Sequence, residues 1–272
     1  MPELPEVETT LRGISPHITG SPITTVSVRQ KKLRWPVSKE IEKLGGTTIT
    51  NARRRGKYLL LEVPESNGTL IFHLGMSGSL RICTTEQPLR KHDHIEMLFA
   101  NGKAMRYHDP RRFGCALWCD SQPELHPLLA NLGPEPLSDE FNGEHLFQLS
   151  RKRKVCVKTF IMNSHTVVGV GNIYASESLF MSGLRPGRSA SRISMERYNL
   201  LAENIRKVLA NAIEMGGTTL RDFVNSDGEP GYFSQQLLVY GRAGESCRDC
   251  GTVIKNRVIG QRSSFYCPQC QQ

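Results

Sequence analysis

Four cysteines near the end of the chain have the spacing of a metal site. They form two Cys-x2-Cys pairs, Cys247 with Cys250 and Cys267 with Cys270, separated by sixteen residues. Each pair can place two thiolates on one turn, and two such turns complete the tetrahedral sulfur site that suits Zn²⁺. Redox use of the pairs is the alternative. Because so short a segment cannot build an adequate apolar core, we expect one structural zinc ion that fixes a hairpin around residues 258–266.

The first residues of the chain offer a nucleophile. Removal of Met1 would expose the secondary amine of Pro2. An α-amino group titrates near pH ~8, well below a lysine amine, so a useful fraction is unprotonated at neutral pH. Attack on a sugar C1′ would give an iminium ion that acidifies the C2′ proton and permits β-elimination, and Glu3 could carry the proton. The alternative is an ordinary chain start, since many chains begin Met-Pro.

Two further features suit phosphate groups. Residues 169–172 place glycines just before a helix, where backbone N–H groups and the helix dipole attract anions. The segment does not match the dinucleotide fingerprint, because Tyr174 stands where the third glycine is needed. With the tight turn at 183–187 it resembles a DNA-backbone clamp, and an ordinary helical hairpin is the alternative. Arg262 on the expected hairpin could reach a phosphate or a groove, unless it is simply a solvated arginine.

The charge balance favours a polyanionic partner. The chain has 35 Lys and Arg against 26 Asp and Glu, a net charge of +9. Clustered cations gain free energy by displacing the counterions condensed on phosphates. A single basic run is usually a solvated face. Runs at 53–57, 110–113 and 151–154 together predict a phosphate-binding cleft between two domains.

Length and composition limit the class of protein. A chain of 272 residues with 38% hydrophobic residues is long enough for two domains and is typical of a globular protein. The chain has no apolar run long enough for a membrane span and an acidic start that lacks a signal peptide, so we expect a cytoplasmic protein. In a reducing compartment the remaining cysteines, Cys83, Cys115, Cys119 and Cys156, are expected to be buried thiols.

The elements that must position these residues change character along the chain. A helix with Val7, Leu11 and Ile14 on one face opens the sequence, and a hairpin turn is expected at 101–102. Short apolar strands follow the helix and predict a sandwich or barrel; they are Ile23–Arg29, Lys57–Val63, Leu70–Leu74, His94–Phe99 and Cys115–Cys119. After a linker at 133–137, helices are expected at Asp139–Ser150, Lys154–Met162, Asn172–Met181 and Ser194–Met215.

Taken in order, the motifs resemble the formamidopyrimidine-DNA glycosylase family of base-excision enzymes, which remove oxidised purines and then nick the strand. The matching segments span nearly the whole chain, without departure at a catalytic position; they are Pro2–Glu8, Gly56–Leu60, His73–Gly78, Lys91–His94, Asp109–Gly114, Gly169–Ala175 and the terminal cysteine ribbon. The resemblance implies an α+β multidomain fold. Its parts are a β-sandwich with a leading helix at 1–132, a helix-two-turn-helix domain at 133–237 and a zinc-ribbon hairpin at 238–272.

The resemblance also implies roles for single residues. Pro2 would be the Schiff-base nucleophile, Glu3 the acid that assists base loss, and Lys57 the proton donor associated with β-elimination. Arg262 is associated with δ-elimination, which we interpret as a phosphate clamp, because arginine hardly ever gives up a proton. DNA contacts are implied for His92, Arg111, Lys152 and Asn172, and a wedge that fills the gap left by an everted nucleotide is implied for Met76, Arg111 and Phe113.

The expected partner is double-stranded DNA with oxidised purines or abasic sites, bound by a monomer under a lesion-recognition loop at 216–232. Core packing is the alternative for Met76 and Phe113. The sister endonuclease VIII type, which prefers oxidised pyrimidines, is the nearest alternative function, and Leu4 with the wedge residues favours the purine enzyme. A non-enzymatic zinc-ribbon DNA-binding protein would explain the charge and the zinc, but not Pro2 and Glu3.

Overall fold

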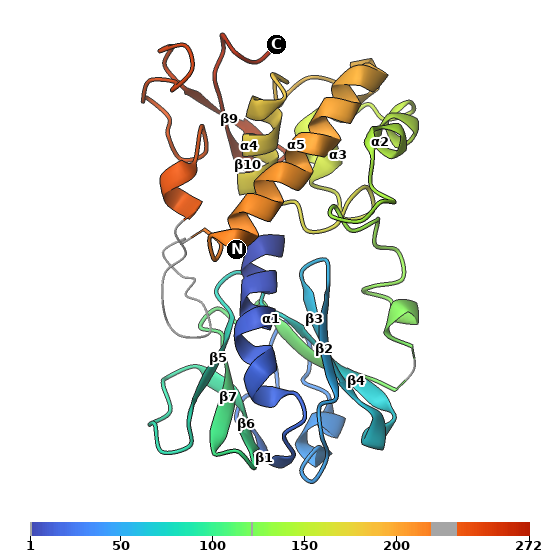
Figure 1. Cartoon of the computed structure of the whole chain (residues 1–272), viewed down its shortest axis with the longest axis vertical. Helices are drawn as coiled ribbons and strands as arrows, with labels where there is room; N and C mark the ends of the chain where they lie inside the picture. Colours follow the sequence, from blue (N-terminus) through green and yellow to red (C-terminus); the bar gives the residue numbers. More distant parts are fainter. Residues whose placement is uncertain (1, 121, 219–232) are drawn as a thin grey trace. The chain divides into compact units, whose positions relative to one another are not determined.

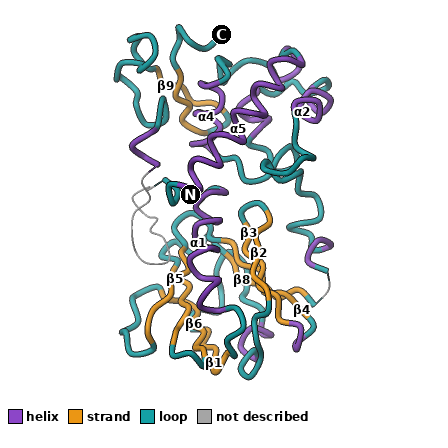
Figure 2. The backbone as a smooth tube through the Cα atoms, viewed as in Figure 1, coloured by secondary structure: helices purple, strands orange, loops and turns teal. Residues whose placement is uncertain are grey.

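The computed structural model describes residues 2–120, 122–218 and 233–272, which divide into two compact units. The sandwich unit holds the described residues of 1–131 and 215–232, and the helical unit holds those of 132–214 and 233–272. Figure 2 shows that strands dominate the first unit, whereas helices and one two-stranded ribbon form the second. The three-domain division at 1–132, 133–237 and 238–272 stays a prediction.

Two antiparallel four-stranded sheets form the sandwich unit (Figure 1). The first sheet has the order β1-β6-β7-β5 and the second the order β2-β3-β4-β8. The strands are β1 (Ile23–Val28), β2 (Asn51–Arg55), β3 (Tyr58–Val63), β4 (Gly68–His73), β5 (Ser79–Thr84), β6 (Asp93–Phe99), β7 (Lys103–His108) and β8 (Cys115–Cys119). The expected hairpin turn joins β6 to β7, with Gly102 at a φ of 75°. The predicted β-sandwich is confirmed.

Helix α1 (Leu4–Ile18) covers the sandwich core. It contacts β5 and β7 of one sheet and β2 and β3 of the other. Val7, Leu11 and Ile14 are buried on its inner face, as their spacing predicts, in one cluster with residues such as Phe72 and Met97. The helix is therefore fixed by apolar burial, and its first residues are held against the sheets.

Arg53 and Arg54 of the basic run at 53–57 are paired with carboxylates, which corrects the expectation that these two arginines are free to bind phosphate. Residues 53–55 belong to β2, and Arg53 pairs with Glu62 and Glu124, both at 2.7 Å. Arg54 donates to Glu8 of α1 at 2.9 Å. Although burial raises the pKa of Glu8, the guanidinium groups of Arg54 and Arg12 hold it below its ordinary value. Arg53 and Arg54 therefore stabilise the edge strand β2 of the sandwich.

The helical unit contains α2 (Gly143–Ser150), α3 (Val157–Ile161), α4 (Asn172–Met181) and α5 (Met195–Glu214). Helices α2 and α3 start later than predicted. Asn142 caps α2 by accepting from the His145 N–H at 2.9 Å. Before α3 begins, the backbone of Cys156 forms an isolated antiparallel β-bridge with Ser189. Cys156 is only half-buried, so the prediction of a buried thiol is wrong there; the other three are buried. Short 3-10 turns lie at Lys39–Lys43, Pro64–Ser66, Pro123–Leu125, Ala190–Arg192 and Phe233–Gln236.

Strands β9 (Lys255–Ile259) and β10 (Arg262–Tyr266) form the expected terminal ribbon, which packs on α4. Glu177 of α4 is buried, and its carboxylate accepts the backbone N–H groups of residues 238, 239 and 240 at 2.7–3.0 Å. Burial raises the pKa of Glu177, although these three N–H groups oppose the rise. None of the described helices is long and apolar enough to cross a bilayer.

Candidate active site and zinc centre

The start of α1 is buried and held by a neighbouring carboxylate. Pro2 is buried and Glu3 is 2% exposed, whereas Met1 lies outside the described residues. One oxygen of Glu6 accepts the Glu3 N–H at 2.8 Å, and the other accepts the N–H of Thr218 at 2.9 Å. Glu6 therefore fixes the backbone of Glu3 against the segment that follows α5. Sequence reasoning did not single out Glu6.

Lys57 lies in the turn between β2 and β3, close to the end of β4. Arg54, which is paired with α1, donates to the Gly56 carbonyl at 3.0 Å and thereby fixes this turn. Tyr58 is paired in register with His73, and their rings are 4.8 Å apart. Burial, with a contribution from the Lys57 ammonium, lowers the pKa of His73 to about 4. The neutral His73 ring accepts the Gly75 N–H at 3.0 Å and orders the loop that carries Met76.

The structure brings the expected wedge residues onto two loops that touch. A Cβ added to Gly75 would lie 2.5 Å from the Phe113 carbonyl carbon, so the two backbones are in direct contact. Phe113 is 45% exposed, and Met76 is half-buried. The Arg111 guanidinium lies 4.9 Å from the centre of the Phe113 ring. The exposure of Phe113 argues against a core-packing role for it.

A buried carboxylate that sequence reasoning missed joins these two loops. Asp109 is fully buried and accepts hydrogen bonds from the Ser77 hydroxyl at 3.1 Å and from the Gly114 N–H at 2.9 Å. Its backbone N–H donates to the carbonyl of His92, which has a φ of 78°. The loops of Met76, His92 and Phe113 therefore converge on one residue.

A second group of predicted residues lies in the helical unit, around the start of β10. The Asn172 side-chain amide donates to the Ser263 carbonyl at 3.0 Å. Lys158 of α3, which sequence reasoning also missed, is 1% exposed and donates to the same carbonyl at 2.9 Å and to the Ser264 hydroxyl at 2.6 Å. These contacts hold the ribbon beside exposed Arg262. Lys152 is also exposed, between α2 and α3.

The four ribbon cysteines converge on one point. Their sulfur atoms all lie within 4.8 Å of one another. Cys247 and Cys270 are 3.9 Å apart at sulfur, and Cys250 and Cys267 are 3.4 Å apart, too long for disulfides. Zn–S bonds of about 2.3 Å in a tetrahedron require sulfur separations of roughly 3.8 Å. The donor set and its spacing therefore fit one zinc ion held by four thiolates.

The β-sandwich with its leading helix, the helical unit and the four-thiolate ribbon together define a multidomain zinc-ribbon protein. Family models match in the same order: the formamidopyrimidine-DNA glycosylase N-terminal domain at residues 1–116, its H2TH domain at 132–224, and the zinc finger found in FPG and IleRS at 244–272. The chain therefore belongs to the formamidopyrimidine-DNA glycosylase family, as the sequence motifs indicated.

Individual relatives agree over their full lengths. The formamidopyrimidine-DNA glycosylase of Methylococcus capsulatus is 59% identical over 273 residues, which cover all of both chains. A Lactococcus lactis FPG mutant in complex with DNA that contains Fapy-dG has a TM-score of 0.92 at 32% identity, with both chains fully covered. The Lactococcus lactis enzyme with abasic-site DNA has a TM-score of 0.91 at 32% identity over 99% of each chain. These relatives are enzymes, so the alternative of a non-enzymatic DNA-binding protein is discarded. The zinc-finger family model and the four-cysteine cluster confirm the expected structural zinc.

Cys250→Ser should release the zinc and unfold the ribbon while the sandwich stays folded. One of four ligands is lost, so we expect zinc affinity to fall by more than ~100-fold. The apolar cluster that includes α1 and both sheets contains no ribbon residue. Metal analysis and thermal melting check this, with Cys156→Ser as the control because Cys156 lies outside the sulfur cluster. A variant that keeps a full equivalent of zinc would contradict the four-thiolate site.

Proposed function

We propose that this chain excises oxidised purines from duplex DNA and then cleaves the strand at the abasic site. The observation that carries the proposal is the buried Pro2 and Glu3 at the start of α1, in a chain 59% identical to a formamidopyrimidine-DNA glycosylase. The Lactococcus lactis structures that it resembles hold Fapy-dG and abasic DNA. We also propose that the protein acts in the cytoplasm.

The chemistry divides between a nucleophile and an acid. The Pro2 nitrogen attacks C1′ while the glycosidic bond breaks, and Glu3 supplies the proton needed for base loss and opening of the sugar ring. The resulting iminium ion accepts electrons when the C2′ proton leaves, which expels the 3′ phosphate. Lys57 and Arg262 assist the eliminations by supplying positive charge near the phosphates.

The loops joined by Asp109 hold the duplex open when the damaged nucleotide is everted. Met76 and Phe113 replace the lost stacking, and Arg111 bonds to the orphaned partner base. His92, Lys152 and Asn172 contact the DNA backbone. The predicted lesion-recognition loop at 216–232 lies outside the described residues, except for 216–218.

A cleavage comparison tests the purine preference. Duplexes with 8-oxoguanine opposite C and with thymine glycol opposite A are incubated with excess enzyme, and both single-turnover rates are measured. A faster rate on 8-oxoguanine supports the proposal. The endonuclease VIII alternative predicts the reverse order, and that result would replace the proposed substrate class.

Phe113→Ala should slow excision without unfolding the protein. Extrusion of a paired base costs a few kcal/mol, so loss of the wedge should reduce excision by roughly 10- to 100-fold. Cleavage at a preformed abasic site needs no base extrusion and should change less. Because Phe113 is 45% exposed, stability should change by less than ~1 kcal/mol, against about 2–5 kcal/mol for a truncated core residue.

The control for this variant is Leu125→Ala, because Leu125 is a 68% exposed apolar residue of the same unit. It should change neither rate. Melting temperature is measured beside the two rates. If Phe113→Ala instead lowers the stability and both activities together, the wedge role is wrong and Phe113 serves in core packing.

A further inference from the structure

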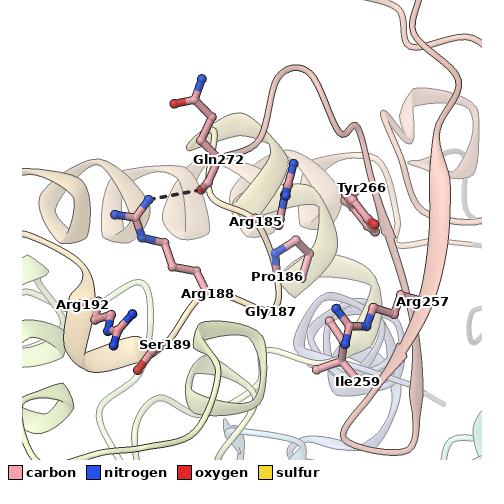
Figure 3. A pocket seen from close by; sticks show the side chains of 10 residues that line it. All are labelled: Arg185, Pro186, Gly187, Arg188, Ser189, Arg192, Arg257, Ile259, Tyr266 and Gln272. Carbon is pink, nitrogen blue, oxygen red and sulfur yellow. Dashed lines mark hydrogen bonds between the residues drawn. The ribbon is translucent and has the colours of Figure 1, made fainter.

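A cavity of about 580 Å³ in the helical unit is lined by none of the expected catalytic, DNA-contact or zinc-binding residues. It is lined by the turn 185–189, by Arg192, by Arg257 and Ile259 of β9, by Tyr266 of β10 and by Gln272. Figure 3 shows the side chains of Arg185, Arg188 and Arg192, which come from the segment 185–192, and on the other side that of Arg257, which comes from the ribbon. Among its described lining residues there is no Asp or Glu side chain.

The four guanidinium groups differ in how they are held. Arg185 donates to the Pro268 carbonyl at 3.0 Å, and Arg188 donates to the Gln272 carbonyl at 3.4 Å, the bond drawn in Figure 3. For Arg192 and Arg257, no residue in the described ranges forms a hydrogen bond or ion pair with the guanidinium group. All four side chains belong to exposed residues. The hollow is therefore lined by two arginines whose guanidinium groups are hydrogen-bonded and by two arginines whose guanidinium groups have no hydrogen-bond partner among the described residues.

The cavity is continuous with two segments that carry expected DNA contacts. The backbone N–H of Ala190 donates to the Val155 carbonyl at 3.0 Å, which places the turn beside the exposed basic run 152–154. On the other side, Ile259 is paired in register with Arg262. A Cβ added to Gly187 would lie 3.8 Å from the Ile259 side chain, so the turn touches the ribbon. The cavity thus lies between the segment that follows Lys152 and the hairpin that carries Arg262.

We propose that this arginine cavity binds backbone phosphates of duplex DNA beyond the damaged nucleotide. The inference rests on the proposed function for the identity of the polyanion. Guanidinium groups match phosphate oxygens in two-pronged geometry and lose less hydration energy than ammonium groups. A hollow with four arginines and no Asp or Glu side chain among its described lining residues therefore suits phosphodiesters. The site would add affinity for long duplexes and take no part in the chemistry.

The test measures how binding depends on salt and on duplex length. The double variant Arg192→Ala/Arg257→Ala removes the two cations without a partner among the described residues, and dissociation constants are measured on duplexes of about 12 and about 30 base pairs with a central stable abasic analogue. Each lost phosphate contact lowers the slope of log affinity against log salt by about 0.9. We expect a slope lower by about 1.8 and at least ~10-fold weaker binding at low salt on the long duplex. Short-duplex binding and cleavage at saturating DNA should be unchanged.

Two further variants separate charge from fold. Arg192→Lys/Arg257→Lys keeps both charges and should restore most of the slope. Arg248→Ala removes an exposed ribbon arginine outside the cavity, which donates to the Gln235 carbonyl at 3.4 Å, and should leave the slope unchanged. A lowered melting temperature in the alanine double variant, with no recovery of the slope in the lysine variant, would assign the effect to folding and overturn the inference.

The remaining outcomes are also decisive. An unchanged slope on the long duplex, or an equal loss on both lengths, overturns the inference. Pyrophosphate binding to the wild-type cavity with an unchanged DNA slope would make it a small-anion site and also overturn it. If the wild-type protein neither excises bases nor cleaves abasic DNA but the slope change is present, the proposed function fails while the cavity still binds DNA phosphates.

Discussion

A variant without a free amine at residue 2 should form no borohydride-trapped complex with abasic DNA. Pro2→Leu tests this, because a bulky second residue prevents removal of Met1 and leaves the nitrogen of residue 2 in a peptide bond. An amide nitrogen cannot attack C1′, so neither an iminium ion nor a reduced adduct can form. We expect trapping and β-elimination to fall below detection. Mass spectrometry of the N-terminus verifies that Met1 is retained.

The matched control is Pro2→Gly, whose small second residue allows Met1 to leave. Its primary amine should still be trapped, although the buried position is less well filled. Affinity for a stable abasic analogue, measured for both variants, shows whether DNA binding survives. Because consecutive Cα atoms are about 3.8 Å apart, the Met1 amine of Pro2→Leu would be displaced from the position of the native nucleophile. Undiminished trapping by this variant would refute the assignment to Pro2.

The sequence predicted strands that show an apolar pattern and missed strands whose buried positions are charged. Strands β5 and β7 carry Arg81 and Arg106, which are both buried. Arg81 pairs with Asp93, and Arg106 pairs with Glu96 at 2.6 Å across the β6–β7 register. The apolar pattern of one strand does not reveal such an ion pair, because each arginine can be buried only when a carboxylate on another strand neutralises its charge.

The same distinction applies to the site. The sulfur cluster was predictable because its ligands are paired within short Cys-x2-Cys segments. Glu6 and Asp109 were not singled out, although both lie inside segments that resemble the family. Glu6 holds Thr218, 212 positions away, and Asp109 accepts from Ser77 across 32 positions. Lys158 donates to the carbonyl of Ser263 in the ribbon, 105 positions away, and no motif in its neighbouring sequence indicates this contact.

The substitution Glu3→Gln should separate base loss from strand cleavage. An amide cannot donate the proton of a carboxylic acid to a leaving group, and loss of general acid catalysis typically costs ~10²- to 10⁴-fold. We expect single-turnover excision of 8-oxoguanine to fall within this range. Cleavage of a preformed abasic site should fall less, because its glycosidic bond is already broken. Stability should hardly change, since glutamine has nearly the same shape and the bond from the Glu3 N–H to Glu6 belongs to the backbone.

Glu8→Gln is the control for Glu3→Gln, because it changes a carboxylate on the same helix that cannot act as an acid. The Glu8 carboxylate pairs with Arg54 at 2.9 Å and Arg12 at 3.0 Å, and its lowered pKa keeps it ionised at neutral pH. Its neutralisation should weaken the contact between α1 and β2 and lower the melting temperature, with little effect on the ratio of excision to abasic cleavage. Glu3→Gln should instead lower that ratio at an unchanged melting temperature. Equal loss of both rates in Glu3→Gln would mean that Glu3 acts at a step common to excision and cleavage, and the role of Glu3 as the acid for base loss would have to be abandoned.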